Sequence, residues 1–271
     1  MKRLKRLYRI ITSQTISDLF WNFLSMCGYR PVMDMEGLRE VKLPPFNEWF
    51  VGENWDKGYH PGNPRCYWIR PDRILNGLYY RPWYIPKYID DRLIPYAVGK
   101  INTYPFAQKY GYWEIMCKIE LQEGLRHAFW GWADKDKTGR ERGYREIDIF
   151  EIDGKDPRQK INIHWGKREN GKSQQIGPIK LRTLKPGTWQ RFGFYWTPEF
   201  MEWYVGDEDG MVGRVVRLTN SKLLKWFNEN ETAIWTLIDQ SVIGAIDPIE
   251  SGSMTVDYCA IYKLEDDGKG N

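Results

Sequence analysis

The stretch that decides the fold is Glu146-Ile147-Asp148-Ile149-Phe150-Glu151, in which three carboxylates are separated by apolar residues. Alternate side chains of a β-strand share a face, so Glu146 and Asp148 point one way and the isoleucine between them points the other way. Glu151 returns to the face of the first two acids only if a β-bulge adds one residue at Ile149–Phe150. A helix would scatter the acids, because offsets of two and five residues do not share a helical face. The spacing therefore predicts a bulged strand with three acids on its open face.

Such a row of acids suits the cleavage of a glycosidic bond. Two carboxyl groups about 5 Å apart can cleave the bond with retention, because one attacks the anomeric carbon while the other protonates the leaving oxygen and later activates water. A third acid between them would interact electrostatically with both and keep their pKa values apart. On spacing alone, a solvated acidic strand edge or a cation site is an equally good interpretation.

The stretch resembles the signature of glycoside hydrolase family 16, the laminarinase, agarase and carrageenase group, whose bulged form is Glu-x-Asp-x-x-Glu. Further segments similar to the family follow in the same order between residues 43 and 264, namely Gly111–Glu120, Ala128–Trp130, Asn162–Trp165, Phe194–Pro198 and Val256–Tyr258. The resemblance implies an all-β fold, a β-jelly-roll sandwich of the concanavalin A-like lectin and glucanase type, with a cleft that binds sugar.

The resemblance also implies a role for each acid. Glu146 matches the nucleophile, Asp148 the assisting acid and Glu151 the acid/base. Trp130 would form the floor of the subsite that holds the attacked sugar, and Trp132 alternates with it on the same face. A tryptophan that only packs in the core is the alternative for Trp130, and a place at the rim is the alternative for Trp132.

Other candidates lie around the motif. His164 and Trp165, on the strand that follows the acids, are expected to contact substrate, although a lone histidine also serves often as a structural hydrogen-bonding group. Asp257 matches a family position that holds a structural calcium on the convex face, and calcium needs several oxygen ligands. No cofactor is expected for catalysis. Arg145 departs from many relatives, which carry a small residue before the nucleophile.

Composition narrows the classes of function. The chain has 271 residues and a formal net charge of +4, which does not by itself indicate a nucleic-acid partner. The 14 Trp and 17 Tyr residues are a surplus that suits stacking on sugar rings. The four cysteines show no Cys-x-x-Cys spacing, so the sequence does not predict a zinc site. Cys117 and Cys259 lie in predicted strands and are expected to be buried thiols, with a disulfide as the alternative.

Residues 1–40 differ from the rest of the chain. A basic start precedes apolar residues at helical spacing, and Gly28 is a plausible stop, so an N-terminal amphipathic helical extension is expected. It would pack on the sandwich, lie on a membrane surface or mediate association. Polar residues interrupt any apolar run, so neither a clear cleavable signal peptide nor a membrane span is predicted. Residues 41–271, entered through Pro44 and Pro45, are expected to form one catalytic domain.

These observations favour an endo-acting retaining glycoside hydrolase of a β-linked polysaccharide, with a β-1,3-glucan of the laminarin type as first choice. A hydrolase of agar, porphyran or carrageenan, a transglycosylase and a lectin-like binding protein are the alternatives. The polysaccharide is the expected partner, the protein is expected to be a monomer, and its action is expected to be extracellular or periplasmic. Smaller elements are also predicted: short strands at Cys66–Arg70 and Gly77–Arg81, and a short helix at Ser221–Asn228.

Overall fold

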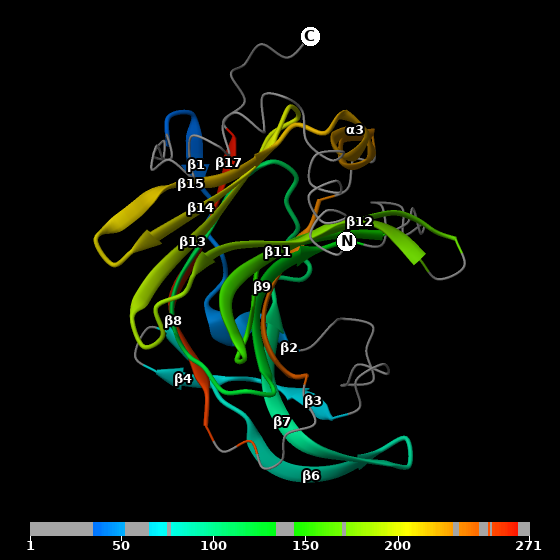
Figure 1. Ribbon diagram of the computed structural model, residues 1–271, viewed down its shortest axis with the longest axis vertical. Coiled ribbons are helices and arrows are strands. Elements are labelled where there is room, and N and C mark those ends of the chain that lie inside the picture. Colours follow the sequence, from blue (N-terminus) through cyan, green and yellow to red (C-terminus); the bar gives the residue numbers. More distant parts are fainter. Residues whose placement is uncertain are drawn as a thin grey trace, which may run out of the picture.

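The computed structural model describes residues 35–51, 65–74, 77–133, 144–169, 172–229, 233–243, 249 and 251–264. In this part of the chain two large β-sheets are stacked face to face, which confirms the all-β sandwich (Figure 1). The N-terminal helical extension was predicted for residues 1–40, of which residues 1–34 lie outside the described residues. The last residues of the expected extension, Leu38–Glu40, form a strand that pairs with the last strand of the chain.

The strands account for most of the described chain. Their bounds are β1 Leu38–Glu40, β2 Phe50–Val51, β3 Cys66–Ile69, β4 Asp72–Ile74, β5 Gly77–Tyr80, β6 Trp83–Ile89, β7 Arg92–Asn102, β8 Gly111–Glu120, β9 Leu125–Trp132, β10 Tyr144–Asp153, β11 Asp156–Glu169, β12 Lys172–Thr183, β13 Trp189–Trp196, β14 Met201–Asp207, β15 Gly210–Leu218, β16 Trp235–Val242 and β17 Ser253–Leu264. A 3-10 turn spans Phe46–Glu48, and helix α3 spans Ser221–Glu229. The short strands β3 and β5 and helix α3 confirm the local predictions.

One sheet has eight strands in the order β15-β14-β13-β8-β17-β5-β4, with β1 beside β17. The other has nine strands, in the order β12-β11-β10-β9-β16-β7-β2, with β3 and β6 also beside β7. The pairs are antiparallel except for β3 with β7. Strand β10, which carries the three acids, therefore lies inside the nine-stranded sheet between β9 and β11, where both of its edges are hydrogen-bonded.

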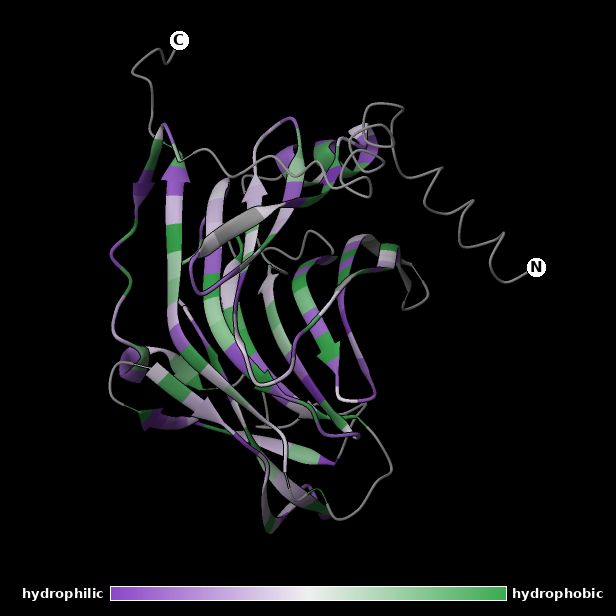
Figure 2. Cartoon of the chain, turned by 60° about the vertical axis from the view of Figure 1, so that its left-hand side comes forward, coloured by the Kyte–Doolittle hydropathy of each residue, from purple (hydrophilic) through white to green (hydrophobic). Residues whose placement is uncertain are grey.

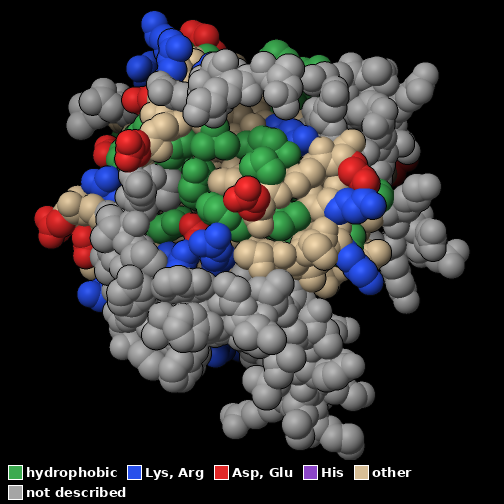
Figure 3. Space-filling model, turned by 90° about the horizontal axis from the view of Figure 1, so that it is seen from above, with side chains coloured by type: hydrophobic (Ala, Val, Ile, Leu, Met, Phe, Trp, Pro, Cys, Tyr) green, Lys and Arg blue, Asp and Glu red, His purple; other side chains and the backbone are tan. Residues whose placement is uncertain are grey.

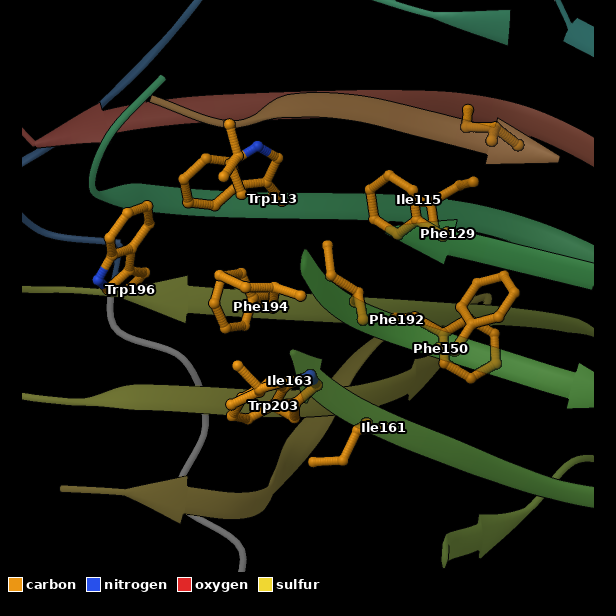
Figure 4. Packing of buried hydrophobic residues seen from close by; sticks show 14 of the residues in the cluster. Trp113, Ile115, Phe129, Phe150, Ile161, Ile163, Phe192, Phe194, Trp196 and Trp203 are labelled. Atoms are coloured by element: carbon orange, nitrogen blue, oxygen red, sulfur yellow. The ribbon is translucent and has the colours of Figure 1, made fainter. Parts of the chain in front are cut away.

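The core lies between the two sheets. Figure 4 shows aromatic rings of β8, β13 and β14 meeting apolar side chains of β9, β10 and β11. Phe150 is fully buried there, and the centroid of its ring lies 4.6 Å from that of Phe192 in the opposite sheet. Burying one such side chain stabilises the fold by roughly 1.5–3 kcal/mol. The apolar residues of the acid stretch therefore anchor the strand that presents the acids.

Two of the cysteines lie on neighbouring strands of the eight-stranded sheet. Cys117 on β8 and Cys259 on β17 are both free thiols, so the disulfide that the sequence left open between them is not formed. In the strand register Cys117 faces Val256, and Cys259 faces Ile115. Their surroundings are therefore apolar, and burial raises the pKa of each thiol.

Alternation along the strands sets the two faces of each sheet apart. Apolar and polar residues succeed one another along many strands in Figure 2, and the core between the sheets is built from apolar residues of these strands. Helix α3 follows the helical version of this rule, because Leu223, Leu224 and Phe227 are its buried residues.

Seen from above, this end of the molecule exposes hydrophobic side chains with acidic and basic ones around them (Figure 3). Within the described residues, no helix has the length and apolar character needed to cross a membrane.

Candidate functional site

The three acids lie on the outer face of the nine-stranded sheet. Between Asp148 and Glu151 the register of β10 shifts against β11, and between Asp148 and Phe150 it shifts against β9. This is the bulge that the spacing predicted, and Ile149 and Phe150 both point into the core. Glu146, Asp148 and Glu151 together line one cavity of about 450 Å³ on the outer face.

Side chains from elsewhere satisfy the main chain at the bulge. A bulge leaves peptide groups without their ladder partners, and such groups need other hydrogen bonds when they are buried. The amide of Gln159 donates to the carbonyl oxygen of Ile149 at 3.1 Å. The indole of Trp203, from the opposite sheet, donates to the carbonyl oxygen of Asp148 at 3.4 Å. The irregular backbone that aligns the acids is therefore held from both sheets.

The remaining wall of the cavity is polar. Besides the three acids, its lining consists of Arg126, Lys160, Asn162, His164, Gln175, Pro178 and Lys180. These residues come from β9, β11 and β12, the strands on either side of β10 and the edge strand beyond. The charged side chains were not singled out from the sequence. For Arg126 a signal existed, because it continues the alternation Trp132, Trp130, Ala128 along β9 onto the same face.

The middle acid is the most buried of the three. Asp148 is 4% exposed, and this burial raises its pKa well above the usual aspartate value. The neighbouring charges of Glu146 and Glu151 raise that pKa further, whereas a hydrogen bond with Asn162 and the charge of Arg126 lower it. Asp148 therefore retains a proton more readily than an ordinary aspartate.

Glu151 has a mixed environment. Burial raises its pKa and outweighs the charge of Arg126, which lowers it. The Nη1 atom of Arg126 lies 2.5 Å from Oε1 of Glu151, and the amide nitrogen of Asn162 lies 2.5 Å from Oε2. Both carboxyl oxygens of Glu151 therefore have a donor within hydrogen-bond distance. A glutamate with a raised pKa is the kind of group that serves as a general acid near neutral pH.

Trp130 and Trp132 lie where the alternation placed them. In the register of β9 against β10, Trp130 faces Asp148 and Trp132 faces Glu146 on the acid side of the sheet. The two rings meet edge to face, with 6.1 Å between their centroids. Trp130 is partly exposed, while Trp132 is 8% exposed. Trp130 thus offers more ring surface to a ligand than Trp132 does.

A buried cation lies beside Trp130. The Nζ atom of Lys100 on β7 lies 5.0 Å from the ring centroid of Trp130 and 4.2 Å from that of Trp68. The same Nζ atom lies 3.4 Å from Oδ2 of Asp239 on β16, and both side chains of this ion pair are buried. An ammonium between two indole faces makes cation–π contacts, which are strengthened when the cation is out of water. This arrangement fixes the orientation of Trp130.

His164 and Trp165 lie on opposite faces, because adjacent residues of a strand alternate. His164 faces Glu146 across the β10–β11 pair and lines the cavity. Trp165 belongs to the core between the sheets, where its ring centroid lies 6.4 Å from that of Trp226 on α3. The expectation that Trp165 contacts substrate is therefore wrong.

Arg145 also faces away from the cavity. It pairs with Trp165 in the register of β10 and β11 and is fully buried, with its guanidinium carbon 5.8 Å from the ring centroid of Trp226. The departure from the family at this position thus alters the packing between β10 and α3, and not the lining of the cleft.

Asp257 lies on the other sheet, far from the acids in the topology. It is exposed at a register shift of β17 and borders a separate cavity of about 370 Å³. Calcium prefers six to eight oxygen ligands. Among the described residues, the one group of three acidic or histidine side chains with ligand atoms within 4.8 Å of one another is Glu146, Asp148 and His164. Asp257 would therefore depend on main-chain oxygens, and calcium binding there stays a prediction.

Comparison with known proteins identifies the same family that the acid stretch resembles. The sequence profile described as glycosyl hydrolases family 16 matches residues 88–260. The endo-1,3-1,4-beta-glycanase EglC of Rhizobium meliloti (strain 1021) is 27% identical over 179 residues, which are 64% of this chain and 34% of that protein. The chain thus spans about a third of the length of the curated relatives that it matches.

Solved structures share the fold. The catalytic domain of an endo-1,3-beta-glucanase (laminarinase) from Thermotoga petrophila RKU-1 superposes with a TM-score of 0.63 at 20% identity, covering 84% of this chain and 99% of that chain. A 1,3-alpha-1,4-beta-D-galactose-4-sulfate-3,6-anhydro-D-galactose 4 galactohydrolase superposes with a TM-score of 0.60 at 17% identity, covering 87% of this chain and 99% of that chain. Both likenesses concern the fold.

Proposed function

Because this chain belongs to glycoside hydrolase family 16, we propose that it is an endo-acting hydrolase that cleaves a β-linked polysaccharide with retention. The observation that carries the proposal is the bulge of β10, which brings Glu146, Asp148 and Glu151 to one cavity. A lectin-like protein on the same fold would not need all three acids.

In the proposed mechanism the carboxylate of Glu146 attacks the anomeric carbon of the bound sugar while Glu151 gives a proton to the departing oxygen. A covalent bond then joins the sugar to Glu146. Glu151, now a carboxylate, removes a proton from water, which hydrolyses that bond. Asp148, with its raised pKa, holds a proton beside the nucleophile and limits the negative charge of the row. If a second sugar replaced water, the same residues would perform transglycosylation.

The favoured substrate is a β-1,3-glucan of the laminarin type. EglC is described as acting on 1,3-1,4-linked glycans, and the Thermotoga petrophila neighbour as acting on 1,3-β-glucan. The partly exposed Trp130 would stack on the attacked sugar. A sulfated galactan is the second candidate, since Arg126, Lys160 and Lys180 line the cavity and the galactohydrolase shares the fold. A polymer substrate favours action outside the cell or in the periplasm.

Release of reducing ends from laminarin, lichenan, agarose, porphyran and carrageenan tests the substrate. Glu146→Gln and Glu151→Gln are each expected to lower turnover on the accepted polymer by several orders of magnitude while the fold survives. Glu123→Gln is the matched control, because Glu123 is exposed and pairs with Lys155 at the surface. Activity of either acid variant comparable with that of the control would remove the assignment.

A further inference from the structure

A guanidinium joins Glu151 to a fourth carboxylate that is not part of the acid row. Arg126 on β9 donates from Nη1 to Oε1 of Glu151 at 2.5 Å and from Nε to Oδ1 of Asp153 at 2.7 Å. The side chains of Arg126, Glu151 and Asp153 are 33%, 16% and 17% exposed, so all three are shielded from water over most of their surface. Ion pairs in such a site are screened less than pairs at the surface.

The strand register builds this bridge. Arg126 lies opposite Asp153, and Glu151 lies opposite Ala128, whose methyl group leaves room for the guanidinium to lean toward Glu151. The donors of a guanidinium form a rigid planar fork, so one arginine can hold two carboxylates in a fixed relative orientation. Asp153 also accepts a hydrogen bond from Lys160 of β11. Asp153 therefore accepts hydrogen bonds from both neighbouring strands, from Arg126 of β9 and from Lys160 of β11, and this fixes its position relative to Arg126.

The bridge bears directly on proton transfer. Donors at both oxygens suit the carboxylate form of Glu151, which is the form needed to activate water. To act as an acid it must carry a proton on one oxygen, and the donor at that oxygen must then give way. Asp153 allows this, because Arg126 can release Glu151 and remain bonded to Asp153.

We propose that Arg126 is a positioning residue that alternates between bridging Glu151 to Asp153 and resting on Asp153 alone, according to whether Glu151 is acting as base or as acid. The inference rests on the proposed function of Glu151. It concerns residues outside the family motif, and it makes Asp153 part of the catalytic arrangement without contact to the reacting atoms.

Other charged groups surround Glu151 on each neighbouring element. They are Glu146 and Asp148 on its own strand, Lys160 on β11, Lys180 on β12, and Asp239 on β16 with its partner Lys100 on β7. Lys160 is bonded to Asp153, Lys180 to Asp156 and Lys100 to Asp239. Within the described structure, Arg126 is thus the cation that is hydrogen-bonded to Glu151.

The proposal predicts opposite effects of two substitutions on the alkaline limb of the pH profile of kcat/KM. Arg126→Gln removes the cation beside Glu151, so Glu151 should keep its proton to higher pH and the limb should rise by about one pH unit. Asp153→Asn removes a nearby negative charge and frees Arg126 for Glu151, so the limb should move to lower pH. Both changes should lower the rate. General damage to the site would lower the rate without shifting the limb in opposite directions.

Arg158→Gln is the matched control. Arg158 is exposed on β11 and is bonded to Asp156, so its loss should leave the limb in place. The proposal would be overturned if the alkaline limb did not move in either Arg126→Gln or Asp153→Asn, or if it moved in the same direction in both variants. If Arg126→Gln does not fold, the proposal is still tested by Asp153→Asn, in which the alkaline limb should move to lower pH. Glu151→Gln, measured alongside, separates the two claims, because its activity loss tests the proposed function whatever the limbs do.

Discussion

Nε2 of His164 lies 3.6 Å from Oε1 of Glu146, across the pair formed by β10 and β11. Burial lowers the pKa of His164 below its usual value. The imidazole is therefore neutral around neutral pH, and it is a polar neighbour of the proposed nucleophile without being a permanent counter-ion. A neutral neighbour leaves the carboxylate its negative charge and hence its reactivity toward the anomeric carbon.

We expect His164→Leu to lower kcat roughly ten- to a hundredfold, the effect of losing one polar partner worth about 1.5–3 kcal/mol. Above about pH 6.5, the ordinary histidine pKa, the residue removed is uncharged, so the alkaline limb of the pH profile should stay where it is. Steady-state kinetics on the accepted polymer measure both quantities, with His164→Asn as the variant that retains polarity. An unchanged kcat in His164→Leu would show that this contact has no catalytic role.

We expect Asp148 to lower the stability of the folded protein although it supports activity. Its pKa is raised in the folded protein, so in the window above the unfolded value of about 3.9 the unfolded state loses the proton first and stability falls as pH rises. Asp148→Asn removes this cost, and the melting temperature of the variant should exceed that of the wild type at about pH 8 but match it closely at about pH 4. Thermal unfolding at the two pH values measures the difference. A variant that is less stable than the wild type at the higher pH would contradict the account.

The same variant should lose activity. The amide that replaces the carboxyl group in Asp148→Asn cannot exchange a proton with its neighbours, so the nucleophile loses its partner and the rate should fall. As pH rises, the wild-type Asp148 would lose its proton, and its negative charge would then oppose the ionisation of Glu151. An amide cannot acquire this charge, so the alkaline limb should move to lower pH in the variant. A profile of kcat/KM against pH for wild type and Asp148→Asn gives both results, and an upward movement of the limb would remove Asp148 from this role.

The bulge could be predicted from the sequence because its cause is local. Offsets of two and then three residues between acids, with apolar residues in all other positions, can be reconciled with one open face only by adding a residue to the strand. Ile149 and Phe150 are both buried, as that reasoning requires. The amphipathic helix at Ser221 was predictable for a similar reason, since its pattern lies within nine residues.

The bridge from Arg126 to Glu151 could not be predicted in the same way. It depends on the register of β9 against β10, which places Ala128 beside Glu151, and the two bonded residues are 25 positions apart. For Trp165, in contrast, the sequence suggested a contact that the structure does not contain. Its closeness to the motif suggested a sugar contact, but strand alternation assigns either His164 or Trp165 to the cleft and not both.

The stereochemistry of cleavage follows from the bulged strand. Carboxyl groups presented by one strand on one cavity wall are expected to be too close for a water molecule to attack from the opposite face of the sugar, which inversion requires. For a β-linked substrate the first product should therefore be the β-anomer. Proton NMR of the earliest hydrolysate distinguishes the anomers before mutarotation, and an α-anomer as first product would mean that the acids act in another way.

The last prediction concerns a second histidine, inside the core. His127 on β9 is fully buried beside Gln240 of β16, and burial lowers its pKa to about 4. The unfolded chain binds a proton at this residue with the ordinary pKa of about 6.5. Between these two values the unfolded state therefore holds more protons, and stability falls as pH is lowered through the window.

His127 should therefore cost the protein about 2 kcal/mol of stability at about pH 5 relative to neutral pH. We expect His127→Leu to be less sensitive to acid by this amount, measured as the change in the urea midpoint between about pH 7 and about pH 5. His164→Leu is the matched control, because His164 is partly exposed, so its loss should alter the acid sensitivity less. Equal acid sensitivity of wild type and His127→Leu would mean that the protein admits the charged imidazole at this place in the core.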